Sequence, residues 1–531
     1  MPATVLVLLF WAGLGFVLTG CGALVLSRSV LPVSAIEAFW VGLAALLCLG
    51  NLWHLLRPLD VWFWAAPVAA AGAGWWRVRL RRGEPLVSLT VAVFAVWVAG
   101  HALAPLSSPD AAVYHVQVVR WYADAAVVPG LGNLNPYAAF NHAYFILPAA
   151  FGLGPFADRG WHLVNGLLVV AAMPLPATAA LRLLRGRTEL TAVLVFTTLL
   201  AARLFDAPLM MSMSGPTADV AALAGGVFLL SRAANRPTGP AWVSGLLLAA
   251  VLSLKPTSLG VVLAAALAEW RWPERWHLRE TGSAVALAAA SLLPWLGHGI
   301  VLSGYLIYPV ASLRLPLDWA VPSAIAESLQ GWAWAFARWP AHSVAEVEAG
   351  WARHWLEREL LHNRDFLLPA ATSVIGAAGL AAISWWRRPS ANTLALGGAV
   401  GVGLLVWWVT LPDLRFAGAS LWALAGVSLG AIAELLDQRR YLVGLLVTAL
   451  VLGAFLGPEE KVRWASEVPS VPESDCRPAR LSTGEWVCEA RSGDRCFKKE
   501  CARVSAETIG TRRPPELSSG FRAVVIDGGT P

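Results

Sequence analysis

The 531-residue chain is 57% hydrophobic and only 14% charged, whereas a soluble domain carries roughly 25% charged residues. Its mean hydropathy is +0.60, and apolar runs of about 18 or more residues, each long enough to cross a bilayer, recur along most of it. The net charge of +6 comes from Arg residues spread over short loops rather than gathered on one basic face, which argues against a nucleic-acid-binding protein. The composition therefore predicts an all-α polytopic membrane protein.

The apolar runs predict about fourteen membrane-spanning helices. The first run lacks the basic start and the small-residue cleavage site of a signal peptide, so we expect it to be a span. Some runs in the middle of the chain are short, and a run of about 14 residues also fits a re-entrant segment. The expected spans cover residues 3–26, 31–53, 59–76, 85–106, 161–181, 188–206, 217–231, 241–254, 256–270, 282–303, 366–386, 391–411, 416–436 and 441–457.

The basic residues of the short loops are concentrated in alternate loops. One set begins at Arg28 and ends at Arg440, whereas the short loops of the other set carry mainly single basic residues such as Arg57. The positive-inside rule places the first set in the cytoplasm. Both termini and the two long loops, 107–160 and 304–365, are then expected on the outer face of the membrane.

The first long loop opens with the sequence SSPDAAVYH. The serine and proline before Asp110 suit an N-cap and a first helical position, and Asp110 itself falls in the first turn, near the positive end of the helix dipole. Apolar residues at helical spacing predict an amphipathic helix over 109–125, lying at the membrane surface. Tyr114 lies four residues after Asp110 and shares its face, whereas His115 lies about 100° to the side.

More polar residues follow in the same loop. Arg120 lies on the predicted amphipathic helix, and the sequence PGLGNLNPY then ends that helix with turn-forming residues. A second helix is expected over about 137–150, and it would carry Asn141 and His142.

Three charged residues mark outward ends of later spans. Asp219, in SGPTADV, starts a span, and a first-turn acid has a structural role there as well. Lys255, in SLKPTS, lies at an outward helix break, where its ammonium group could satisfy carbonyls that the following proline leaves free. Arg415, in PDLRF, starts a span at the outer face, where an arginine is either functional or reaches toward lipid headgroups.

The second long loop is also expected to be helical. The sequence DWAVPSAIAESLQGWAWAFARWP predicts an amphipathic surface helix rich in tryptophan. Ser343 and Glu346 then form a capping-box pattern, which predicts a helix extending to about residue 361.

The polar tail, residues 458–531, contains four closely spaced cysteines. Their spacing differs from paired CxxC zinc knuckles, and in an oxidising compartment such a group predicts two disulfides that close a small domain with little core. The connectivity cannot be deduced from the sequence, although pairing of neighbours is simplest; a metal site or free thiols are the alternatives. The cysteines are Cys476, Cys488, Cys496 and Cys501.

These features resemble the GT-C superfamily of integral-membrane glycosyltransferases, in which the first large external loop begins with an acidic residue just after a transmembrane helix. The phrase YHVQVVRWYADAAVVPGLGNLNPYAAFN also resembles a largely uncharacterised bacterial membrane-protein family assigned to that superfamily. The similarity covers most of the chain, including GYLIYP at 304–309, PDLRF at 412–416 and the sequence Gly520-Phe521-Arg522 near the end.

The resemblance implies a GT-C-like helical bundle in a bacterial inner (plasma) membrane, with amphipathic external loop helices and a small extracytoplasmic tail. It implies transfer of a sugar from a polyprenyl-phosphate donor to a glycan, lipid or protein acceptor on the outer face. Asp110 matches the acid that serves as general base, or that holds the base and a divalent metal ion. Many members have two adjacent acids here, whereas Ala111 follows Asp110 in this chain, which weakens the expectation of a metal site.

The other site residues take their expected roles from the same resemblance. His115 is the candidate for a second catalytic polar group, and Arg415 and Lys255 are the candidates for binding the donor phosphate. The remaining candidates for lining the substrate are Tyr114, Arg120, Asn141, His142 and Asp219.

Two readings from other functional classes stay open. A lipid-linked saccharide flippase or transporter predicts ionisable residues buried within spans, for which Glu37 is the main candidate, and internal repeats, of which none is apparent. A non-catalytic assembly scaffold would need neither Asp110 nor Arg415. Walker, HExxH and GxSxG motifs in a suitable context are lacking, so ATPase, metalloprotease and hydrolase functions are unsupported.

Overall fold

The structure is a computed structural model that describes residues 1–27, 34–78, 83–185, 212–235, 239–270, 278–384, 389–417, 419–435, 464–491, 493 and 495–524. Within these residues six helices are long and apolar enough to cross a membrane, so the protein is a mostly helical membrane protein, as predicted. Two predicted spans, 188–206 and 441–457, lie outside the described residues.

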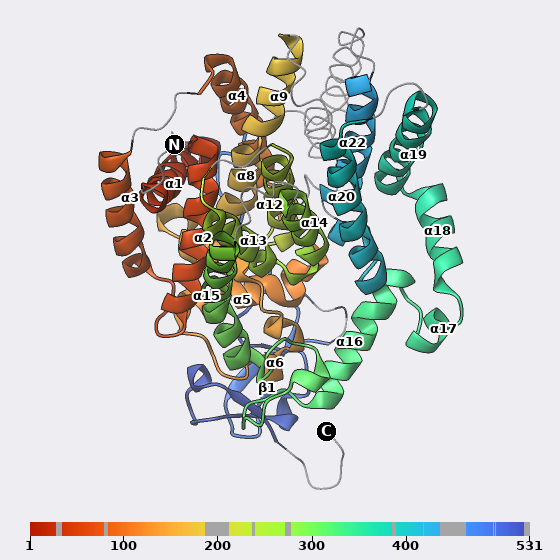
Figure 1. Cartoon of the computed structure of the whole chain (residues 1–531). Coiled ribbons are helices and arrows are strands. Elements are labelled where there is room, and N and C mark those ends of the chain that lie inside the picture. Colours follow the sequence, from red (N-terminus) through yellow and green to blue (C-terminus); the bar gives the residue numbers. More distant parts are fainter. Residues whose placement is uncertain are drawn as a thin grey trace.

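The six candidate spans pack into one bundle (Figure 1). They are α1 (Ala3–Leu26), α2 (Ala35–His54), α4 (Pro85–Ala102), α8 (Trp161–Ala172) continued by α9 (Pro174–Leu184), α15 (Leu278–Ser303) and α20 (Ala391–Thr410). Further helices pack against these spans or against one another, namely α3 (Ala65–Arg77), α12 (Ala218–Ala234), α13 (Ala241–Leu254), α14 (Leu259–Trp270), α19 (Arg364–Ser384) and α22 (Ala419–Leu435). The closest neighbours include α1 with α2, α13 with α15, and α14 with α20.

Glycines allow α1 and α2 to touch backbone to backbone. A Cβ atom on Gly22 would lie 1.7 Å from the carbonyl oxygen of Ala38, and one on Gly42 would lie 1.8 Å from that of Leu18. Small residues at such contacts let helices approach closely in a membrane, where packing replaces the hydrophobic effect as the driving force. The contact fixes α2, whose last residue, His54, contacts the first long loop through a hydrogen bond to the carbonyl of Ala125.

The helix predicted over 109–125 is present, but it is not a surface helix. It consists of a π-helical turn, η2 (Ala111–His115), followed by α5 (Val116–Asp124). Most of α5 is buried, because it packs against α7 (Ile146–Phe151) and is covered by the tail. Its amphipathic pattern therefore reflects burial between protein layers rather than contact with lipid.

The continuous helix expected over 137–150 is wrong. The chain forms η3 (Pro136–Ala139), an extended segment, η4 (Ala143–Phe145) and then α7. The interruption is explained by Asn141, whose amide donates to the carbonyl of Trp295 while the indole of Trp295 donates back to the Asn141 carbonyl. The backbone carbonyl of Asn141 thus accepts from α15 rather than from the N–H four residues on, as it would in a helix.

The second long loop contains the predicted helices with one difference. Helix α16 (Ser323–Arg338) matches the tryptophan-rich sequence, and both bonds of the Ser343–Glu346 capping box are formed at the start of α17 (Val344–Glu348). The helix does not continue to 361, because the chain breaks at Gly350 before α18 (Trp351–His362) begins. In Figure 1, α16 lies at the same end of the molecule as α6 (Leu131–Leu134) and the tail strands.

The tail forms two small sheets closed by two disulfides. Strands β1 (Arg477–Arg480), β2 (Trp486–Glu489) and β3 (Cys501–Ala502) form one sheet, and β4 (Ile509–Thr511) pairs with β5 (Phe521–Ala523). The disulfides join Cys476 to Cys488 and Cys496 to Cys501, which confirms the expected disulfides in their simplest pairing. The remaining short elements are η1 (Val61–Trp64), η5 (Gly154–Phe156), η6 (Pro256–Ser258), η8 (Ala311–Leu313), α21 (Leu414–Ala417), η10 (Ala506–Thr508) and η11 (Leu517–Ser519).

Candidate functional site

Five charged residues from four separate segments of the chain lie close together. Arg415 lies with one guanidinium nitrogen 3.7 Å from a carboxylate oxygen of Asp110 and another 3.1 Å from one of Asp413. Lys255 forms a salt bridge with Asp219. The ring of Phe416 joins the two pairs, because its centre lies 4.4 Å from the Lys255 ammonium and 5.4 Å from the Arg415 guanidinium. We refer to Asp110, Asp219, Lys255, Asp413 and Arg415 as the charged cluster.

Local backbone chemistry places four members of the charged cluster at the ends of α12, α13 and α21. Asp219 lies in the first turn of α12, where the hydroxyl of Thr217 accepts from its backbone N–H and donates to its carboxylate. Lys255 ends α13 in an extended conformation, since Pro256 follows and starts a new turn. Asp413 accepts a hydrogen bond from the backbone N–H of Arg415 and so stabilises the start of α21. These four charged groups are therefore fixed at helix ends.

The two ion pairs differ in their access to solvent. The side chains of Lys255 and Asp219 are only 10% and 22% exposed, whereas those of Arg415 and Asp110 are 47% and 45% exposed. The pair of Lys255 and Asp219 is therefore mostly buried, whereas the pair of Arg415 and Asp110 is about half exposed to solvent. When all five groups are ionised the cluster carries one surplus negative charge.

The surroundings of Asp110 oppose its ionisation. Burial by the protein on one side raises the pKa of the Asp110 carboxyl, while the charge of Arg415 acts in the opposite direction and Asp219 reinforces the rise. A carboxylate whose pKa is raised is a stronger base than a solvated one, which suits it to accept a proton in a reaction.

Two histidines lie behind the charged cluster. Burial lowers the pKa of His115 to about 3 and that of His142 to about 3, so both rings are neutral at physiological pH. The ring centres of His115 and His142 lie 5.4 Å and 5.7 Å from that of Phe145. Among the described residues, the Nδ1 atom of each histidine has no hydrogen-bond partner. His115 is thus able to donate or accept a hydrogen bond but does not carry the charge of a general acid near neutral pH.

Aromatic side chains lead from the surface to Tyr114. Trp332 of α16 is 49% exposed, and its ring packs edge-on against Tyr137 with centres 5.9 Å apart. Tyr137 in turn stacks on Tyr114 at 6.1 Å. Tyr114 is buried, and the charge of Asp110 contributes, after burial, to raising its pKa. Trp332 is thus the exposed end of a row of rings whose other end, Tyr114, is buried.

Two predicted substrate-lining residues have other partners in the structure. Arg120 donates to the carbonyl of Phe497 and so attaches α5 to the tail. Asn141 is engaged by Trp295, and its side-chain oxygen also lies 3.1 Å from Nδ1 of His298. These bonds give both residues structural roles. Asp413 is the charged residue that the sequence reasoning missed, although its position two residues before Arg415 was a usable signal.

The described carboxylates do not form a preformed metal site. Among the described residues, the one group of three metal-ligand side chains within reach of a single ion is Cys476, Cys488 and Cys496. Their sulfur atoms belong to the two disulfides and are not thiolates. In the charged cluster, the carboxylate of Asp219 pairs with Lys255, and those of Asp110 and Asp413 pair with Arg415.

One comparison with known proteins gives a match. A family model described as a domain of unknown function, DUF8201, matches residues 5–422. This range includes every member of the charged cluster and stops before the tail. No curated protein and no solved structure shows significant similarity to the chain.

Proposed function

The chain belongs to the DUF8201 family, and from the charged cluster we propose that it is a GT-C-type membrane glycosyltransferase. It takes a sugar from a polyprenyl-phosphate donor and transfers it to an acceptor hydroxyl at the outer face of a bacterial plasma membrane. The single observation that carries the proposal is the placement of Asp110, whose carboxylate lies 3.7 Å from the half-exposed guanidinium of Arg415 and in one cluster with Lys255.

The reaction needs a base and a positive charge at neighbouring points. The acceptor hydroxyl gives its proton to the Asp110 carboxylate, and its oxygen forms a bond to the anomeric carbon of the donor sugar. The bond from that carbon to the phosphate oxygen breaks, and its electron pair leaves with the polyprenyl phosphate. Arg415 and Lys255 stabilise the negative charge that develops on this leaving group.

A lipid-linked saccharide transporter is the second candidate. It is favoured by one buried ionic network within the bundle, in which Arg232 of α12 binds Glu37 of α2 and Glu269 of α14. Buried ionisable residues in membrane helices mark transport routes in many proteins. The network also bonds Ser244 of α13, so it equally suits a structural clamp between four helices.

The deciding experiment is a transfer assay with the purified full-length protein in nanodiscs. A panel of radiolabelled polyprenyl-phosphate sugars is supplied together with a membrane extract as the source of acceptors. We expect label to move from at least one donor to a product that is no longer a polyprenyl-phosphate sugar. A donor that remains unchanged but crosses the bilayer in proteoliposomes would establish the transporter instead, and a chain that neither binds nor moves any donor would fit a scaffold.

The transfer rate should depend on pH through Asp110. Because burial raises the pKa of this carboxyl, its protonation begins above the ordinary value of 3.8, and a protonated Asp110 cannot accept the hydroxyl proton. We therefore expect the rate to fall on the acid side with an apparent pKa above 3.8. In Arg415→Gln the positive charge that lowers this pKa is lost, so the acid limb should move to higher pH. Normalised pH–rate profiles of both proteins test this, and coincident acid limbs would contradict it.

A further inference from the structure

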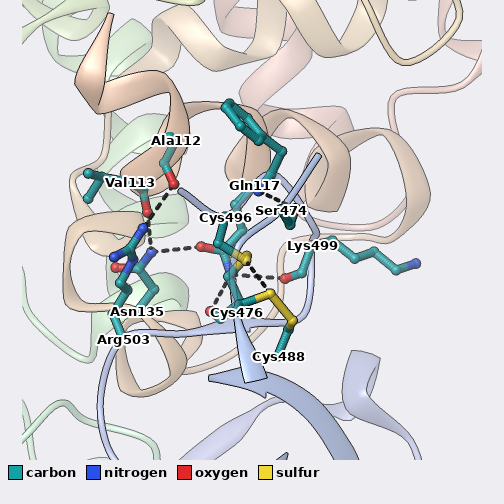
Figure 2. The surroundings of a disulfide bond; sticks show 12 residues. Ala112, Val113, Gln117, Asn135, Ser474, Cys476, Cys488, Cys496, Lys499 and Arg503 are labelled. Carbon is teal, nitrogen blue, oxygen red and sulfur yellow. Dashed lines mark hydrogen bonds between the residues drawn. A yellow bond between two sulfur atoms is a disulfide. The ribbon is translucent and has the colours of Figure 1, made fainter. Parts of the chain in front are cut away.

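The tail binds the chain at the turn that carries Asp110. The backbone N–H of Cys496 donates to the carbonyl of Ala112 at 3.2 Å, and the guanidinium of Arg503 donates to the same oxygen at 3.0 Å. Figure 2 shows both groups pointing at Ala112 from the tail. Ala112 is two residues after Asp110, so whatever fixes this carbonyl also restricts the position of the carboxylate.

The π-helical turn follows from this contact. In an α-helix the carbonyl of Ala112 would accept from the N–H of Val116, four residues on. Here the N–H of Val116 donates to Ala111 instead, five residues back, which is the bond of a π-helix. The neighbouring carbonyl of Val113 is also used from outside the helix, by the amide of Asn135 at 2.8 Å. The tail and Asn135 thus take the carbonyls that a regular helix would have used.

The contact points on the tail are held by its disulfides. Cys496 is bonded to Cys501, and Arg503 follows Cys501 by two residues, so one short loop presents both donors. Cys501 lies in β3, which pairs with β2 at Cys488, and Cys488 carries the second disulfide. The donors therefore belong to a covalently closed unit rather than to a free segment.

A second set of hydrogen bonds keeps this unit on α5. The buried amide of Gln117 donates to the carbonyls of Lys499 at 2.9 Å and Cys501 at 2.8 Å, and the indole of Trp121 donates to Lys499 as well. Gln117 also accepts from Asn135 at 2.7 Å, which connects the tail contacts to the contact at Val113. The tail, α5 and the π-helical turn form one hydrogen-bonded unit.

From these contacts we infer that the disulfide-closed tail is a positioning element of the site. Arg503 and the backbone N–H of Cys496 hold Ala111–His115 in a π-helical turn, and this turn sets where Asp110 and His115 lie relative to Arg415. Arg503 is a positioning residue in this arrangement, since it acts on Asp110 through Ala112. The consequence for transfer rests on the function proposed above, whereas the structural coupling does not.

The structural coupling is tested by hydrogen exchange on the full-length protein in nanodiscs. Loss of a hydrogen bond from a charged donor in Arg503→Gln should raise exchange of the amides of residues 111–116 by roughly tenfold, with the amides of α1 unchanged. Arg503→Lys keeps one charged donor and should give an intermediate effect. Arg480→Gln changes an arginine of the same tail that packs on Trp486, and it should leave residues 111–116 as in the wild type.

Opening the tail loop is the second test. The double substitution Cys496→Ser with Cys501→Ser should raise exchange in the same residues, whereas Cys21→Ser with Cys48→Ser, at the two free cysteines, should not. Unchanged exchange at 111–116 in both Arg503→Gln and the Cys496/Cys501 variant would overturn the inference. An equal rise throughout α1 and α2 would overturn it too, because it would indicate general unfolding rather than local coupling.

Transfer kinetics separate this inference from the proposed function. If the wild type transfers sugar, we expect Arg503→Gln to lower kcat with little change in KM for the donor, and Arg503→Lys to restore part of kcat. If the wild type transfers nothing, the proposed function fails while the exchange results still decide the coupling. If Arg503→Gln raises exchange at 111–116 but transfers sugar at the wild-type rate, the turn does not position the catalytic groups and that part of the inference is wrong.

Discussion

Asp110→Asn is expected to reduce sugar transfer by roughly a hundred- to ten-thousand-fold, the usual contribution of a positioned general base. Asparagine has nearly the same shape as aspartate but cannot accept the proton of the acceptor hydroxyl. Arg415 keeps its hydrogen bonds to the Asp413 carboxylate in this variant, so the donor phosphate should still bind. The expected pattern is a large loss of kcat with a donor affinity close to that of the wild type.

Asp60→Asn provides a matched control for this experiment. Asp60 also lies before a helical turn, in a segment that contacts α5, where the backbone N–H of Leu59 donates to the carbonyl of Tyr122. Its side chain accepts from the backbone N–H of Trp62, a bond that asparagine can also make. We expect the control to transfer sugar at the wild-type rate. Equal activity of Asp110→Asn and the wild type would place the base elsewhere while leaving the reaction class intact.

The largest expected effect on folding comes from the buried network around Arg232. Its guanidinium binds Glu37, Glu269 and the hydroxyl of Ser244, and its side chain is only 7% exposed. Arg232→Met would leave the buried carboxylate of Glu269 and the partly buried one of Glu37 without their cation, and breaking a buried ion pair in this way costs about 3–5 kcal/mol. We expect a correspondingly lower free energy of unfolding, measured by tryptophan fluorescence during denaturation in detergent micelles.

Two further variants identify the cause of that loss. Adding Glu269→Gln to Arg232→Met removes one of the unpaired charges and should recover part of the stability. Arg185→Met breaks an ion pair with Glu84 in which both side chains are about half exposed, and it should leave the unfolding transition unchanged. An Arg232→Met protein as stable as the wild type would show that the network is dispensable for folding. A role of these buried charges in transport would then be favoured.

Much of the charged cluster was predictable because charged residues at the ends of apolar spans are costly and therefore informative. Asp110, Asp219, Lys255 and Arg415 were each singled out by that argument, although they lie on segments far apart in the chain. The sequence could not show that Lys255 pairs with Asp219, or that Phe416 lies against both cations. Those contacts depend on how α12, α13 and α21 pack, which no local pattern encodes.

Two of the wrong expectations trace to long-range hydrogen bonds, whereas the helix expected to reach residue 361 ended at a local break at Gly350. The helix expected over 137–150 was interrupted by the contacts of Asn141 with α15, and the helix expected at the membrane surface was buried under the tail. The same tail bonds produce the π-helical turn after Asp110. A helix propensity describes a segment in isolation, and it is overridden when distant groups compete for the backbone carbonyls.

The sequence by itself determined the environment and the local chemistry of this protein. Hydropathy and run length required a helical membrane protein, and cysteine spacing predicted the disulfides that close the tail. Only the tertiary structure decided that these charged residues form one cluster and that the tail is hydrogen-bonded to the turn that follows Asp110. The reason is that burial and helix capping follow from neighbouring residues, whereas ion pairs and carbonyl contacts join residues up to several hundred positions apart.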